Sequence, residues 1–146
     1  MDQNIIPLIN GVLYSWASVV VTIGGAPITG ITAIEYEDKQ TVENIYGAGR
    51  YPIGRAKGRV EPTAKITLLQ ETVEDLQRQA PFGRIQDLGL FHIGVTYVSE
   101  SGRIVHDTIR NCSFTTNKRS WKEGDTKSEV ELDLVVSHIQ WGAQLA

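Results

Sequence analysis

The sequence predicts a mainly β protein, an antiparallel β-sandwich or barrel with one flanking α-helix. Three observations lead to this fold class. Segments that alternate apolar and polar residues recur along the chain, as expected of strands with one buried face. Only the stretch around residues 70–80 has the apolar spacing of a helix. Six or more strands with a single helix are typical of a sandwich or barrel.

Composition indicates one domain, residues 1–146. Of the 146 residues 41% are hydrophobic and 21% charged, as in ordinary globular proteins. A chain of this size buries roughly 70% of its unfolded surface. The net charge of −3 argues against a dedicated nucleic-acid binder, which needs a positive field. A single cysteine, Cys112, excludes an intramolecular disulfide, and we expect it to be a small core residue.

The N-terminal residues 1–14 are expected to form an arm that leads into the fold. They are short and apolar, and Pro7 and an Asn-Gly turn signal interrupt them. No basic stretch precedes them, so a secretory signal is not predicted. No run approaches the ~20 apolar residues of a membrane span, so no membrane anchor is expected.

The first strands are predicted to form a hairpin. Residues 16–23 are rich in Val and Thr, and the turn at 24–27 returns the chain into a strand at 28–37. Residues 42–46 could add a short strand. The second strand alternates an apolar face with an acidic one: Ile34 and Tyr36 against Glu35 and Glu37.

The predicted helix follows an extended segment at 64–69. Leu69, Val73, Leu76 and Ala80 lie at spacings of a single helical face, which we interpret as core packing. Acidic and polar residues occupy the rest, and the Pro-Phe-Gly at 81–83 ends the helix.

The final third is predicted to be β, with strands at 91–97 and 104–114 joined by a turn at 99–102. A turn at 123–125 precedes the clearest strand, 129–141. Beyond Val136 its buried side inverts, which indicates a bulge or a passage from one environment into another. Before that point Val130, Leu132, Leu134 and Val136 face one way and Glu129, Glu131 and Asp133 the other.

A glycine-rich basic stretch at 47–59 is predicted to be a long loop. Such a loop buries little apolar surface and is usually disordered or functional. Its charges and its apolar tip suggest that it docks onto a partner. The candidate contact residues are Gly47, Gly49, Arg50, Tyr51, Pro52, Gly54, Arg55, Lys57, Gly58 and Arg59.

No catalytic, metal or cofactor site is predicted. His92, His106 and His138 lie on different strands without metal-ligand spacing. The loop imitates a phosphate-binding P-loop, but Ala56 replaces its Ser/Thr and no helix follows. The acidic strand residues project in parallel rather than converging, so they form either a solvated face or the acidic wall of a water-filled channel.

In this order of elements the chain, from about residue 16 to 141, resembles the bacteriophage tail-tube proteins, which share a fold with the type VI secretion tube protein. The resemblance rests on the hairpin around Gly24-Gly25, on the Gly/Pro/basic loop, on the strand Ile66-Thr67-Leu68-Leu69 that runs into an acidic helix, and on the hairpins that follow.

The resemblance implies a non-enzymatic structural subunit. Members form hexameric rings that stack into a tube, their strands joining edge to edge into one inner barrel. It implies that loop 47–59 reaches the next ring. From its positive charge we expect the loop to meet acidic surface there, such as that around Glu71, Glu74 and Asp75. The candidate lumen residues are Glu35, Glu37, Glu129, Glu131 and Asp133.

It further implies a virion location in the phage tail, after assembly in the host cytoplasm, and a contractile tail is favoured. Expected partners are other copies of the chain, the tail sheath, the baseplate and the tape-measure protein, and DNA would pass the lumen without specific binding. The alternatives are a ring-forming tail-end or baseplate protein of the same fold, a small β-barrel nucleic-acid-binding module, and a small β-barrel enzyme or ligand carrier.

Overall fold

The computed structural model describes residues 6–14, 17–23, 26–99, 101–118 and 129–142. The elements, in chain order, are strands β1 (Leu8–Ile9), β2 (Ala17–Ile23), β3 (Ala26–Pro27), β4 (Ile31–Tyr46) and β5 (Pro52–Leu69), helix α1 (Gln70–Gln79), the 3₁₀ turns η1 (Pro81–Gly83) and η2 (Ile85–Asp87), and strands β6 (Phe91–Val98), β7 (Ile104–Phe114), β8 (Glu129–Val135) and β9 (His138–Gln140).

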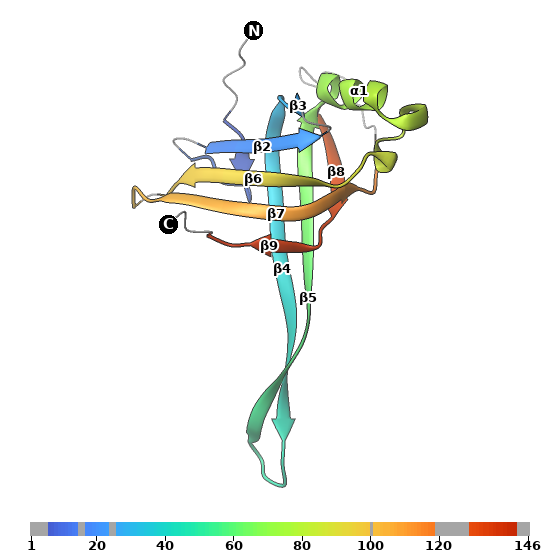
Figure 1. Ribbon diagram of the computed structural model, residues 1–146. Helices are drawn as coiled ribbons and strands as arrows, with labels where there is room; N and C mark the ends of the chain where they lie inside the picture. Colours follow the sequence, from blue (N-terminus) through green and yellow to red (C-terminus); the bar gives the residue numbers. More distant parts are fainter. Residues whose placement is uncertain (1–5, 15–16, 24–25, 100, 119–128, 143–146) are drawn as a thin grey trace, which may run out of the picture.

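The strands form one curled sheet in the order β1-β4-β5-β8-β7-β6-β2-β3, with β9 beside β7. We call β1, β4, β5 and β8 the projecting half, and β2, β3, β6, β7 and β9 the crossing half. Figure 1 shows the strands of the crossing half running across those of the projecting half. Helix α1 lies at one end of the molecule, and the tip of the β4–β5 hairpin lies at the opposite end. The predicted mainly β barrel or sandwich with one short helix is thus confirmed.

Strand β7 joins the two halves. It pairs with β6 and β9 over most of its length, and then with β8 through Ser113 and Phe114. At the change of partner Asn111 has a positive φ of 52°, and the β6–β7 register shifts. Such a bulge bends a strand, so β7 turns the corner between the halves.

The interval between β8 and β9 makes the same turn. The Ser137 amide donates to the Arg110 carbonyl at 3.1 Å, which carries the chain from the projecting half into the crossing half. The passage between environments predicted after Val136 is therefore confirmed.

One hydrophobic core fills the space between the halves. It contains Val130, Leu132 and Leu134, which the sequence predicts to face inward from the last long strand, together with the buried residues of β6. The rings of Phe91 and Phe114 contact each other with centroids 4.9 Å apart. Burial of these alternating apolar side chains supplies the main favourable free energy of folding.

Helix α1 closes one end of this core. Val73 and Leu76 are buried, as is Ala80 directly after the helix. The Thr72 hydroxyl donates to the Thr29 carbonyl at 2.7 Å, which fixes the first turn of the helix against the chain that enters β4. The predicted helix is confirmed with its apolar face inward.

The predicted first hairpin is wrong. Strand β2 pairs with β3 and β6, whereas β4 pairs with β1 and β5. Beyond β3, the Ile28 amide still donates to the Val21 carbonyl of β2, and after this hydrogen bond the chain no longer pairs with β2. Gly30, with φ of +83°, turns it into the projecting half. A left-handed φ at this position favours glycine, and it redirects the strand.

The predicted loop over 47–59 is also wrong in its extent. Residues 52–59 belong to β5, and only 47–51 form the turn of a long hairpin. The separate strands expected at 28–37 and 42–46 are one strand, β4, and the segment at 64–69 is the end of β5. Pairing with β4 along its length satisfies backbone groups that a loop would leave to water.

The N-terminal segment adds a parallel strand to a sheet predicted to be antiparallel. Strand β1 of this segment pairs parallel to β4, and Ile9 is buried in the core. Its described part therefore packs on the barrel. The turn at 99–102 is confirmed by the bond from the Ser99 amide to the Arg103 carbonyl at 2.8 Å. The turns expected at Gly24-Gly25 and at 123–125 lie outside the described residues, as does the first residue of the strand expected at 16–23.

Candidate functional site: a projecting hairpin and an acidic sheet face

The β4–β5 hairpin extends far beyond the barrel. Residues 39–61, which we call the projection, are exposed throughout (Figure 1). At about 3.3 Å per residue, its strands reach on the order of 25 Å outward. A β-hairpin that contacts so little of its own domain has few packing contacts to hold it, so its side chains are available to another molecule.

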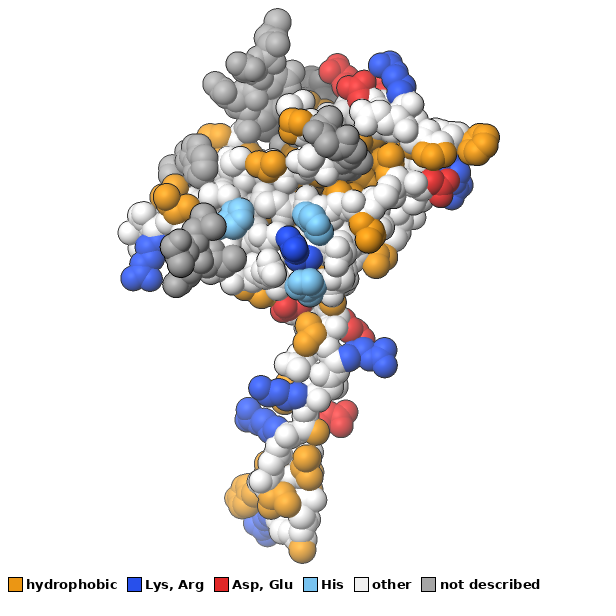
Figure 2. Space-filling view, viewed as in Figure 1, with side chains coloured by type: hydrophobic (Ala, Val, Ile, Leu, Met, Phe, Trp, Pro, Cys, Tyr) orange, Lys and Arg blue, Asp and Glu red, His pale blue; other side chains and the backbone are white. Residues whose placement is uncertain are grey.

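The tip of the projection is apolar. Tyr51 is 77% exposed and Ile53 75% exposed, with Pro52 between them. Figure 2 shows apolar side chains gathered at this end of the molecule. Single exposed apolar residues are common on any protein surface. A cluster of them at an exposed tip, in contrast, is a feature of interaction sites.

The projection is also basic, with five Lys or Arg residues against two Glu. The register pairs Val42 with Lys57 and Asn44 with Arg55, so the two cations share one face. The opposite face carries Glu43, which pairs with Ala56. Two of the basic contact residues expected from the sequence, Arg55 and Lys57, therefore lie together along one side of a hairpin.

A bulge divides the projection from the barrel. The β4–β5 register shifts between Gln40 and Val42, because β5 has one extra residue there. A Cβ on Gly58 would lie 3.2 Å from the Cβ of Thr41, and the side-chain Nε2 of Gln40 donates to the Gly58 carbonyl at 3.2 Å. Glycine allows this close approach, and a bulge increases the local twist of a hairpin.

The predicted lumen residues lie together on one sheet face. Register places Glu35 opposite Lys65 and Lys65 opposite Asp133 across β4, β5 and β8. All five expected carboxylates are exposed on this side, which we call the acidic face: Glu35, Glu37, Glu129, Glu131 and Asp133. The apolar and acidic alternation predicted for both strands is therefore confirmed.

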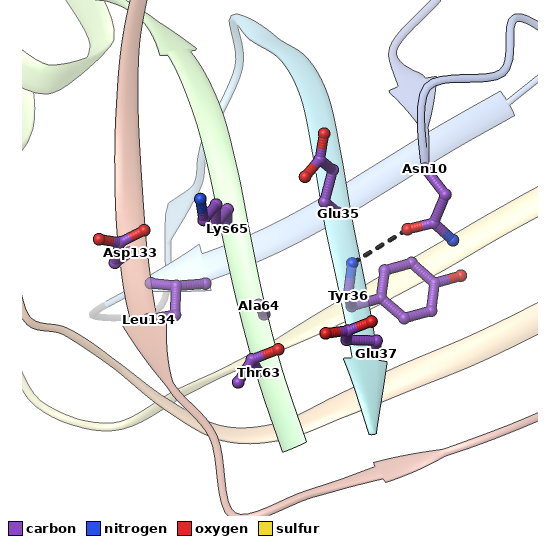
Figure 3. A pocket seen from close by; sticks show the side chains of 9 residues that line it. All are labelled: Asn10, Glu35, Tyr36, Glu37, Thr63, Ala64, Lys65, Asp133 and Leu134. Atoms are coloured by element: carbon purple, nitrogen blue, oxygen red, sulfur yellow. Dashed lines mark hydrogen bonds between the residues drawn. The ribbon is translucent and has the colours of Figure 1, made fainter. Parts of the chain in front are cut away.

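Lys65 is the residue of this face that sequence reasoning missed. Its Nζ lies 3.5 Å from Glu131 Oε1, and it stands between carboxylates on either side. Figure 3 shows Lys65 between Glu35 and Asp133, around a hollow of about 600 Å³. Lys39 Nζ lies 3.5 Å from Glu37 Oε1 on the same side. Two ammonium groups beside five carboxylates lower the repulsion between the carboxylates but leave the face acidic. Only the strand register reveals the pairing of Lys65.

A buried polar network anchors the C-terminal part of the described chain. Asp107, the one buried charged residue among those described, accepts the Tyr36 hydroxyl at 2.5 Å and the Gly142 amide at 2.7 Å. Trp141 Nε1 donates to Asp38 Oδ2 at 2.8 Å, and its ring packs 5.3 Å from that of Tyr36. Burial, and then the bond to Asp107, raise the pKa of Tyr36 far above its usual value.

This network lies where the projection leaves the barrel. Tyr36 is the last buried residue of β4, and Asp38 directly precedes the projection. The hydrogen bonds that Asp107 accepts and Trp141 donates therefore hold the base of the hairpin in place. Sequence reasoning missed the network, because its partners are 71 and 103 residues apart in the chain.

The described residues contain no group of three His, Cys, Asp or Glu placed to hold a metal ion. His92 and His138 are exposed and His106 half-buried, on the side of the crossing half seen in Figure 2. Burial raises the pKa of Cys112 to about 12, so its thiol is not an activated nucleophile. The P-loop-like stretch leads into β5 rather than a helix. No helix in the described part of the chain has the length and apolar character to cross a membrane.

No family model matches the sequence, and no curated protein matches it. Solved structures do match. A chain of the sheath–tube complex of an extracellular contractile injection system, PVC, in its extended state has 11% identity and a TM-score of 0.54, over 84% of this chain and 88% of that one. The fold is tail-tube-like.

Two further matches come from the anti-feeding prophage. A chain of its baseplate has 9% identity and a TM-score of 0.54, over 88% of this chain and 93% of that one. A chain of its tube-terminating cap has 14% identity and a TM-score of 0.50, over 97% and 94%. The tail-tube-like fold thus extends over nearly the whole chain, at identities that establish the fold alone.

Proposed function

We propose that this protein is a self-assembling structural subunit of a tail tube, in a phage tail or a related contractile injection apparatus. Six copies form a ring, rings stack into a hollow tube, and the protein performs no catalysis. The observation that carries the proposal is the joining of a tail-tube-like fold to a long, exposed, basic and apolar hairpin.

The edges of the projecting half support ring formation. Strand β1 covers β4 only at Ala33 and Ile34, so within the described chain the rest of β4 has β5 as its only strand partner. Strand β8, on the other side of β5, pairs with β7 only at Leu134 and Val135. Open edges invite pairing with another chain, and closure into a ring pairs them. Copies joined from β4 to β8 would make one continuous barrel.

The same three strands carry the acidic face, so that face would line the lumen of such a ring. Glu35 and Asp133 flank Lys65 there. Carboxylates repel phosphates, so DNA would slide through without being held. The projection would extend along the tube axis to the next ring, as expected of its basic and apolar residues. The tail sheath, baseplate and tape-measure protein are the further partners we propose.

A ring that ends the tube is the second candidate. The matches to baseplate and cap structures favour it, because chains in such positions share the fold. Negative-stain microscopy of concentrated protein separates the two, since a tube subunit grows stacked rings and an end protein stops at one ring. A monomer that shifts an oligonucleotide would instead indicate a nucleic-acid-binding module.

The proposal is tested with the double variant Arg55→Glu and Lys57→Glu. Both side chains are exposed on the projection, so the monomer should fold normally. An exposed ion pair contributes at most ~1 kcal/mol, but every copy in a ring repeats the loss, so stacking should fail. Sedimentation and microscopy measure tube growth.

The matched control, Arg103→Glu with Arg110→Glu, reverses two cations outside the projection, Arg103 in the turn before β7 and Arg110 on β7, and should leave stacking intact. Normal tubes from the projection variant would refute the stacking role. A wild-type protein that stays monomeric at every concentration and salt would refute the proposed function itself.

A further inference from the structure

The chain between α1 and β6 presents an aromatic side chain fully to solvent. Phe82 is 99% exposed, and its backbone has φ 55° and ψ 23°, in the left-handed region. Few residues other than glycine adopt this region, and a phenylalanine there is uncommon. Folding alone gives no reason to display a large apolar ring in this way.

Backbone bonds hold this conformation. The Gly83 amide donates to the Ala80 carbonyl at 3.2 Å, and the Arg84 amide to the Pro81 carbonyl at 3.1 Å. Gly83 also has a positive φ, of 72°. The turn is therefore built to point Phe82 outward. Leu90, on the same connection, is 70% exposed and adds a second apolar side chain.

Exposed carboxylates accompany these apolar residues. Glu71, Glu74 and Asp75 lie on α1, directly before the Phe82 turn. Arg78 pairs with Asp75 at 3.2 Å, which leaves Glu71 and Glu74 without a cation among the described ion pairs. The α1 end is therefore apolar and acidic, whereas the projection is apolar and basic.

The two surfaces lie at opposite ends of the molecule (Figure 1). They cannot meet within one chain, but they meet when copies align head to tail. A heterologous contact of this kind joins a surface of one copy to a different surface of the next. Like ends would bring two basic projections or two acidic helices together, which is unfavourable.

We propose that Phe82 and Leu90, with the carboxylates of α1, form the seat on which the projection tip of the next copy docks. The occupant is a second copy of this chain, through Tyr51 and Ile53. The inference rests on the proposed function and names the surface that receives the projection. Aromatic side chains at the centre of a contact commonly dominate its affinity, and Phe82 is placed to do so. Arg55 and Lys57 would approach Glu71 and Glu74.

Disulfide trapping tests the contact directly. Cys112 is buried, so introduced thiols are the accessible ones in the described chain. A protein with both Ile53→Cys and Leu90→Cys should give a ladder of covalent oligomers on mild oxidation, because a disulfide needs Cα atoms within about 7 Å. The control with Ile53→Cys and Ile104→Cys should give none, since Ile104 is 74% exposed but begins β7, away from α1.

Phe82→Gly tests the role of the side chain without disturbing the fold, since glycine accepts the left-handed φ. It should remain folded by circular dichroism and need at least a tenfold higher concentration to stack. Glu71→Lys with Glu74→Lys should restore stacking to the Arg55→Glu, Lys57→Glu variant.

The outcomes separate the two proposals. If the wild type stacks while Phe82→Gly stacks equally well, or the Leu90 pair gives no more ladder than the Ile104 control, the seat is refuted and the tube function stands. If the wild type forms neither rings nor stacks, both are refuted.

Discussion

Replacing Tyr36 by Phe should destabilise the fold while leaving its shape unchanged. The substitution keeps the buried ring and its contact with Trp141, whose centroid is 5.3 Å away. It removes only the hydroxyl that donates to Asp107 at 2.5 Å. Asp107 then retains the Gly142 amide as its one other donor among the described bonds.

The cost follows from burial. Tyr36 is 5% exposed and Asp107 is 3% exposed, so water does not replace the lost donor. Hydrogen bonds to charged groups contribute about 1.5–3 kcal/mol, and a buried acceptor left short of donors adds its desolvation penalty. We expect the free energy of unfolding to fall by about 2–3 kcal/mol. At roughly 2–4 °C per kcal/mol for a chain of this size, Tm should fall by roughly 5–10 °C.

Urea and thermal denaturation, followed by circular dichroism on freshly dissociated protein, measure the change. Tyr46→Phe is the matched control, because Tyr46 is exposed on the projection and should change unfolding by less than about 0.5 kcal/mol. A loss at Tyr36 as small as at Tyr46 would show that the buried bond contributes nothing, and would refute the reasoning.

The same group predicts a dependence on alkaline pH. Burial, and then Asp107, raise the pKa of Tyr36 above its ordinary value of 10.0. Above pH 10 the unfolded chain releases this proton and the folded chain retains it, so stability falls as pH rises; below pH 10 the contribution is fully present. The variant Tyr36→Phe should lose less stability than the wild type when each is taken from pH 9 to pH 11.

Three further outcomes are expected. Burial raises the pKa of Cys112 from 9.0 to about 12, so the folded thiol should resist alkylation at pH 8. Above pH 9 this group should lower the free energy of unfolding of the wild type by about 1.4 kcal/mol per pH unit, and Cys112→Ala should not show that loss. Gly30→Ala should lower the free energy of unfolding by about 2 kcal/mol, measured by chemical denaturation, because φ is +83° and the new methyl would lie 2.4 Å from a threonine oxygen. Gly89 has open space around it, so the control Gly89→Ala should leave stability unchanged. Glu131→Lys with Asp133→Lys should preserve assembly in microscopy but retard DNA ejection, and a misfolded monomer would place these side chains elsewhere than the lumen.

Alternation along single strands was readable from the sequence, because it depends only on neighbours. The inward set of Val130 and Leu132, the helix with Val73 and the break after Val136 follow from periods of two and 3.6. These features set the acidic face as well, since Glu131 alternates with buried residues.

Pairing between strands was not readable, because partners far apart in the chain leave no local mark. The turn after β2 suggested a hairpin with β4, yet Gly30 redirects the chain. Four glycines made the projection look like a loop, although β4 holds residues 52–59 in a ladder. Lys65 and Asp107 acquired their roles only through register and tertiary contact.

The isolation of the projection gives a simple reporter of assembly. Arg50, Arg55, Lys57 and Arg59 are all exposed on it, and each is followed by a bond that trypsin can cut. In a free subunit, local opening of so lightly supported a hairpin should deliver these bonds to the protease before the barrel is attacked. Once covered by a neighbour, they should survive digestion. The rate at which trypsin converts the intact chain into fragments would then measure the extent of stacking in solution, without microscopy.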